Sequence, residues 1–158
     1  MPDTSKYRKH INIVMHTAIR RPMFGKCVIG YCAIIDYKGN QKLLSGGKKN
    51  AYRIEFELES LCEVLSVLNQ PCNIEFVSTS KYLCQTLKYI NYYAKNGFCK
   101  KDGSELKHKA LIEKLYSLSK DHCIKATWQK TLVTDESGMK CVVTADVVAD
   151  KYLHGEKG

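Results

Sequence analysis

The pattern of apolar and polar positions divides the first third of the chain into three strands. Apolar and polar residues alternate in the first strand, and the second is apolar almost throughout, as in a strand buried on both faces. The predicted strands cover residues 11–17, 28–35 and 41–45. A loop over 18–26 should join the first two, and a flexible basic loop over 46–50 should follow the third. We expect an antiparallel meander, because short turns connect neighbouring strands.

Helical periodicity dominates the rest of the chain. Apolar residues recur every three or four positions over 54–68 and again over 82–93, where Gly97 marks the end of the helix. A short apolar strand over 74–77 separates these helices, and Thr79 is expected to cap the second one. A further helix over 111–118, a strand over 123–128 and a β-branched helix over 142–152 complete the prediction. This order predicts an α/β domain.

Composition narrows the class of protein. The chain has 158 residues, which suits one domain with one core, and 44% hydrophobic with 26% charged residues indicates a globular protein. Its formal charge of +9 predicts an anionic partner, most commonly nucleic acid, although a membrane surface fits the charge equally well. We expect no membrane association, since no apolar run has the length of a transmembrane helix and the first residues do not resemble a signal peptide.

The eight cysteines are not spaced as in a zinc site, because no two are separated by two residues. Several lie in apolar runs, as do Cys32, Cys62 and Cys141. We interpret them as free, mostly buried thiols of a protein in the reducing cytoplasm.

Four glutamates lie on the helix predicted over 54–68: Glu55, Glu57, Glu59 and Glu63. Glu55 and Glu59 are four residues apart and share a face of the helix. The simplest interpretation is a solvated first turn that complements the helix dipole, with Arg53 beside Glu55.

Lysines and aromatic residues alternate in the segment that follows the helix predicted over 82–93. Cations interleaved with flat rings in a projecting segment favour a polyanion with bases or sugars as the partner. A lysine-rich solvated loop with tyrosines packed beneath it remains the alternative. The candidate nucleic-acid contacts, including the basic loop over 46–50, are Lys48, Lys49, Asn50, Tyr89, Tyr93, Lys95, Phe98, Lys100, Lys101, Lys107 and Lys109.

Six short segments occur in a fixed order along the chain: Gly-Tyr-Cys-Ala-Ile at 30–34, Arg-Ile-Glu at 53–55, Val-Ser-Thr-Ser-Lys-Tyr at 77–82, Asn-Gly-Phe at 96–98, Ile-Lys-Ala-Thr-Trp at 124–128 and Ala-Asp-Val-Val-Ala at 145–149. In their order and near spacing they resemble the type 1 ribonuclease H family. The resemblance implies a ribonuclease H-like fold, with a five-stranded mixed sheet whose first three strands are antiparallel, flanking helices and a basic protrusion. It implies a domain over 11–153, a basic N-terminal extension over 1–10 and a C-terminal tail over 154–158.

The resemblance also implies a catalytic site that lacks two of its four acidic side chains. Enzymes of this family cleave the RNA of an RNA/DNA hybrid with two divalent ions about 4 Å apart, held by four acidic side chains. The corresponding positions here are His16, Glu55, Thr79 and Asp146, so a neutral imidazole and a hydroxyl replace two carboxylates. The family's loop histidine corresponds to Leu132 or a neighbour, and that loop contains no histidine.

Three functions remain open. The first is a ribonuclease H-like protein, monomeric and cytoplasmic, that binds an RNA/DNA hybrid or double-stranded RNA and has lost two-metal hydrolysis. The second is an active hybrid endoribonuclease with an altered site, in which His16, Glu55 and Asp146, with Asp150 or Glu59, hold one divalent ion, Mn²⁺ or Mg²⁺, or Zn²⁺, which imidazole also suits. The third is a protein-interaction module. For the first function we expect no cofactor; His16 then only forms a hydrogen bond at the end of its strand.

Overall fold

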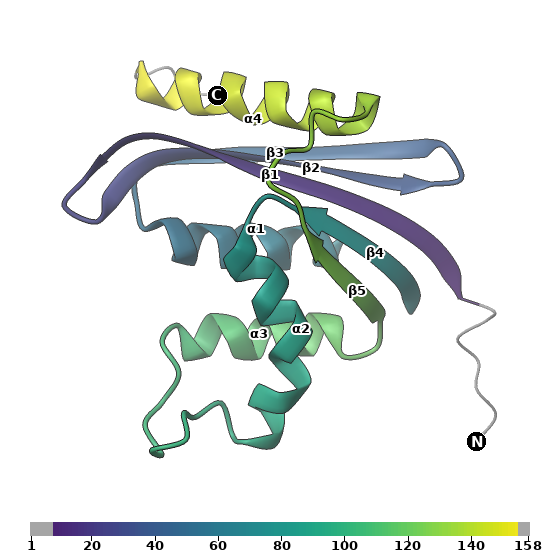
Figure 1. Cartoon of the computed structure of the whole chain (residues 1–158), viewed down its shortest axis with the longest axis vertical. Helices are drawn as coiled ribbons and strands as arrows, with labels where there is room; N and C mark the ends of the chain where they lie inside the picture. Colours follow the sequence, from purple (N-terminus) through teal and green to yellow (C-terminus); the bar gives the residue numbers. More distant parts are fainter. Residues whose placement is uncertain (1–7, 155–158) are drawn as a thin grey trace.

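The predicted fold class is confirmed by the computed structural model, which describes residues 8–154. Within this range a five-stranded mixed sheet has the strand order β3-β2-β1-β4-β5 (Figure 1). β1, β2 and β3 are antiparallel, whereas β4 runs parallel to β1 and β5 runs parallel to β4. The elements in chain order are β1 (Lys9–Met23), β2 (Lys26–Tyr37), β3 (Asn40–Ala51), α1 (Arg53–Ser66), β4 (Cys72–Ser78), α2 (Lys81–Lys95), α3 (Lys109–Ser119), β5 (Cys123–Trp128) and α4 (Glu136–Leu153).

The helices cover the two faces of the sheet unequally. α4 lies alone across one face, and α1, α2 and α3 lie on the other (Figure 1). β1 serves both layers because its side chains alternate: Ile13 and Met15 belong to the larger core on the α1 side, whereas Ala18 belongs to a smaller core beneath α4. Gly30 of β2 allows α4 to approach closely, since a Cβ there would lie 2.7 Å from the backbone nitrogen of Ala149.

The predictions of loops over 18–26 and 46–50 are wrong, because the structure forms β-strand over most of the first segment and all of the second. β1 continues to Met23, which pairs with Lys26, and Pro22 lies where the register shifts, a position at which a missing N–H donor is tolerated. The basic segment 46–50 belongs to β3. Its glycines are needed for packing, because a Cβ at Gly47 would lie 2.6 Å from the ring of Tyr152.

All eight cysteines lie in the described part of the chain and are free thiols, and six of them are buried. The predicted burial of Cys32, Cys62 and Cys141 is confirmed. No helix between residues 8 and 154 is long and apolar enough to cross a membrane. Most of the predicted extension over 1–10 and of the tail over 154–158 falls outside the described residues, so these boundaries stay predictions.

Candidate functional site

His16 and Thr79 meet where β4 ends and its parallel pairing with β1 stops, at what we call the strand-end site. The last pair of this register is Met15 with Ser78, so His16, which continues β1, and Thr79, which follows β4, lie side by side. His16 Nδ1 and Thr79 Oγ1 are 2.8 Å apart and share a hydrogen bond. The indole N–H of Trp128 donates to the Thr79 carbonyl oxygen at 3.1 Å, which further fixes the end of β4. The two neutral side chains that the sequence placed in the site are therefore each other's partners.

A buried carboxylate, Glu57, lies on the α1 side of this edge. Its side chain is only 1% exposed, and the hydroxyls of Thr17 and Ser80 donate to it at 2.7 and 2.8 Å. Ser80, not Thr79, is the N-cap of α2, because its Oγ accepts from the Leu83 N–H. Glu57 thus ties β1, α1 and the start of α2 together, and the expectation that Thr79 caps the helix is wrong.

Glu55, the glutamate singled out from the sequence, does not join this group. It is partly exposed and lines a separate pocket with Gly25, Tyr52 and Lys107. The expected pairing of Arg53 with Glu55 is also wrong, since Arg53 Nε lies 3.5 Å from a carboxylate oxygen of Glu57. A signal available in the sequence was the helical period, because Leu61 and Val64, four and seven residues after Glu57, are apolar, and the structure buries both.

Asp146 approaches the site from α4, on the opposite face of the sheet, and is held by an arginine. The Arg20 guanidinium donates to Asp146 Oδ1 and to Asp150 Oδ1, each at 3.0 Å. These contacts, the bond to Asp146 foremost, raise the pKa of Arg20 above its ordinary value. Arg20 was assigned to a loop by its sequence neighbours; its place on β1, directed toward α4, is what gives it this role.

The His16 ring lies between the two carboxylate groups. Burial lowers its pKa below the ordinary 6.5, and the negative charges of Asp146 and Glu57 oppose this shift without overcoming it. The imidazole is therefore neutral near pH 7. The site combines one neutral ring, one hydroxyl and two carboxylates on opposite faces of the sheet, each beside an arginine.

Comparison with known proteins matches the RNase H family model to residues 17–151 of this chain. The chain belongs to the RNase H family. A ribonuclease H from Helicobacter acinonychis is 35% identical over 124 residues, 78% of this chain and 84% of the relative. A ribonuclease H from Zymomonas mobilis is 33% identical over 132 residues, 82% of each chain.

Solved structures of the family share the fold. LC9-RNase H1, described as a type 1 RNase H with the type 2 active-site motif, superposes with a TM-score of 0.74 at 13% identity, covering 90% of this chain and 73% of that one. The solution structure of the PFV RNase H domain gives a TM-score of 0.66 at 14% identity, covering 95% and 98%.

The residues present do not fit the pair of divalent ions that the RNase H fold implies. Among residues 8–154, no three His, Cys, Asp or Glu side chains lie close enough together to hold a metal ion. Magnesium prefers several oxygen ligands of one compact carboxylate cluster, whereas Glu57 and Asp146 are already engaged by hydroxyls and arginines. Leu132, matched to the family's loop histidine, is buried in the smaller core, so its loop is anchored by an apolar side chain.

The predicted nucleic-acid contacts lie in two places. Lys48, Lys49 and Asn50 are exposed at the end of β3. The others lie on α2, on the segment 96–108 that projects beyond α2 and α3, and at the start of α3 (Figure 1). There the structure leaves the lysines at 95, 100, 101 and 107 exposed and Lys109 partly exposed.

The aromatic residues of this second group differ in exposure. Tyr89 is exposed, with Lys88 Nζ 5.6 Å from its ring centre. Tyr93 and Phe98 pack against the larger core, and Phe98 meets the Tyr116 ring edge to face at 5.9 Å. Tyr89 is therefore available to a partner, whereas Tyr93 and Phe98 are mainly structural.

Proposed function

We propose that this member of the RNase H family binds an RNA/DNA hybrid or double-stranded RNA and has lost two-metal hydrolysis. The observation that carries the proposal is the Arg20 bridge to Asp146 and Asp150. A guanidinium at 3.0 Å supplies at that carboxylate the positive charge that a divalent ion would supply, so a metal would have to compete with it.

The remaining contacts of the site support the loss of cleavage. Two-metal hydrolysis needs acidic side chains that bridge both ions. Here the two strand-end positions hold His16 and Thr79, which hydrogen-bond to each other. Glu57 is nearly inaccessible and already accepts hydrogen bonds from two hydroxyls. A metal would have to displace internal partners from each surviving carboxylate.

Duplex binding does not require acidic side chains that hold metal ions. Recognition of an A-form duplex uses contacts to phosphates and 2′-hydroxyls, which lysines and amides supply. The formal charge of +9 and the exposed lysines of the segment 96–108 support this role. A foamy viral protease-reverse transcriptase with a TM-score of 0.59 has been solved with an RNA/DNA hybrid, and we extend that ligand to this chain. The free thiols suit the reducing cytoplasm, where we propose that the protein acts as a monomer.

The test is incubation with an end-labelled RNA/DNA hybrid in Mg²⁺ and, separately, in Mn²⁺, with binding and cleavage products scored together. The Helicobacter acinonychis ribonuclease H serves as the reference. We expect salt-sensitive binding without cleavage. Cleavage that Glu57→Gln abolishes and Glu55→Gln leaves intact would instead establish an active enzyme with an altered site. Absence of both binding and cleavage would favour a protein-interaction module.

A further inference from the structure

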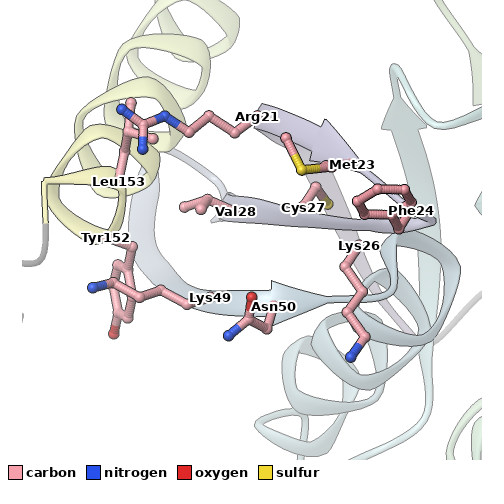
Figure 2. Close-up of a pocket in the computed structure, with 10 residues that line it drawn as sticks. All are labelled: Arg21, Met23, Phe24, Lys26, Cys27, Val28, Lys49, Asn50, Tyr152 and Leu153. Atoms are coloured by element: carbon pink, nitrogen blue, oxygen red, sulfur yellow. The ribbon is translucent and has the colours of Figure 1, made fainter.

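A groove of about 730 Å³ lies at the C-terminal end of α4. Figure 2 shows its walls: the β1–β2 hairpin, the end of β3 and the last turn of α4. The lining residues are Arg21, Met23, Phe24, Lys26, Cys27, Val28, Lys49, Asn50, Tyr152 and Leu153. Neither the strand-end site nor the segment 96–108 contributes to this groove.

Its charge selects an anionic occupant. Arg21, Lys26 and Lys49 are all exposed, and none of the described residues that line the groove is acidic. Three cations without a carboxylate among them favour phosphate groups over a neutral or cationic ligand. The Asn50 amide adds hydrogen-bonding capacity beside them.

Its apolar parts select a flat ligand as well. Phe24 at the hairpin tip is 96% exposed, and Met23 beside it is 66% exposed. The Tyr152 ring forms another wall and packs against Gly47 of β3 so closely that no Cβ would fit between them. An aromatic side chain left almost entirely in water is costly for the isolated protein, and it is suited to stacking on a base.

Three of the six non-glycine residues with positive φ in the described part of the chain line this groove. Arg21, Phe24 and Asn50 adopt positive φ values of 46°, 52° and 51°, a conformation that costs energy for residues other than glycine. A glycine in place of Phe24 would relieve the strain and remove the exposed ring. The chain instead keeps a strained phenylalanine at the tip, which indicates a use for the ring itself.

We infer that this groove binds an unpaired nucleotide of a nucleic-acid strand, with Phe24 stacking on the base and Arg21, Lys26 and Lys49 contacting phosphates. The inference rests on the proposed function, since the strand would be one that continues beyond the end of a bound duplex. A second pocket, which contains Arg53 and Lys107 as well as Glu55, lies between the groove and the segment 96–108 and supports this connection. Lys26 lies over the Tyr52 ring at 5.6 Å, and Tyr52 lines this second pocket together with Lys107 of the segment 96–108.

The experiment compares three labelled probes by fluorescence anisotropy: a blunt hybrid, the same hybrid with an unpaired tail, and the tail oligonucleotide alone. We expect the tail to tighten binding about tenfold, the scale of one stacked base. Phe24→Ala and Phe24→Asn should abolish that gain and leave the affinity for the blunt hybrid unchanged. Arg21→Gln should weaken only the tailed and single-stranded probes. Val143→Ala on the exposed face of α4 and Lys42→Gln on β3 are the matched controls.

The outcomes separate the groove from the duplex site. Equal affinity for blunt and tailed hybrids, or a Phe24→Ala effect of equal size on both, would overturn the inference. Competition by free adenosine monophosphate as effective as by the tail would assign the groove to free nucleotides and overturn the strand as its occupant. If the blunt hybrid does not bind, the proposed function fails; Phe24-dependent binding of the tail alone would still support the groove.

Discussion

Two charged regions of this molecule differ in whether their charged groups have partners within the protein. In the strand-end site, Glu57 accepts from Thr17 and Ser80, and Asp146 is held by Arg20. Around the β1–β2 hairpin and along the segment 96–108, cations and the Phe24 ring face solvent. Groups satisfied internally stabilise the fold and have little capacity left for a ligand, whereas exposed groups cost little to change and remain available. Substitutions should therefore alter stability in the first region and binding in the second.

The largest effect is expected from Glu57→Ala. Removal of the buried carboxylate leaves the hydroxyls of Thr17 and Ser80 without their acceptor, so we expect the free energy of unfolding to fall by about 3 kcal/mol. Glu55→Ala, two residues earlier on the same helix, should change it by less than about 0.5 kcal/mol. Urea unfolding of both variants measures the difference. Equal effects would show that Glu57 is not a structural group.

This pair of glutamates also shows how far the sequence could lead. The α/β class, the five-stranded mixed sheet with three antiparallel first strands and the helix over 82–93 follow from apolar periodicity and family resemblance, and the structure confirms them. The short motif Arg-Ile-Glu pointed to Glu55, whereas the buried stripe of α1 contains Glu57. A motif of three residues can shift by two positions; a stripe sampled over fourteen residues is harder to misplace.

Other features depend on tertiary contacts that the sequence does not express. In the sequence, Gly46 and Gly47 are typical of a flexible loop. In the structure the ring of Tyr31 from β2 packs against Gly46, and the ring of Tyr152 from α4 packs against Gly47. Arg20 and Asp146 are far apart in the chain, and no local pattern links them. The groove is likewise built from four separate elements, β1, β2, β3 and α4, so only Lys49 and Asn50 were singled out beforehand, and as duplex contacts.

The second prediction concerns two carboxylates added to the strand-end site. His16→Asp with Thr79→Asp would place two new carboxylates between Glu57 and Asp146. Without metal, repulsion should destabilise the variant. Saturating Mn²⁺ or Mg²⁺ should then restore about 3 kcal/mol of stability, as expected for a ligand at a hundredfold excess over its Kd. Thermal unfolding with and without metal tests this, with the unchanged protein as control. A variant indifferent to both ions would contradict the view that these two replacements limit metal binding.

The third prediction concerns the exposed lysines. Lys100→Gln with Lys101→Gln should lower the slope of log affinity against log salt for a blunt hybrid by about two, one for each lost phosphate contact. Stability should change by less than about 0.5 kcal/mol, because both side chains are exposed. Lys42→Gln with Lys125→Gln removes the same charge from β3 and β5 and should leave the slope unchanged. Similar slopes for the two double variants would mean that net charge alone attracts the duplex.

The smallest effect concerns the protonation of His16. Burial lowers its pKa in the folded state, so below pH 6.5 the unfolded chain takes up a proton that the folded chain does not. The free energy of unfolding should therefore fall as the pH drops through 6.5, and this contribution should level off below the folded pKa. His122, whose pKa burial also lowers, adds the same trend in every variant.

The difference between the unchanged protein and His16→Asn isolates the contribution of His16. Urea unfolding above and below pH 6.5 should show a weaker acid dependence in the variant. A steeper dependence would mean that Asp146 and Glu57 outweigh burial and hold a charged imidazolium, which would make the strand-end site a cation-binding pocket in its own right. Equal dependence would place His16 in an environment indifferent to its charge, contrary to its partly buried hydrogen bond with Thr79.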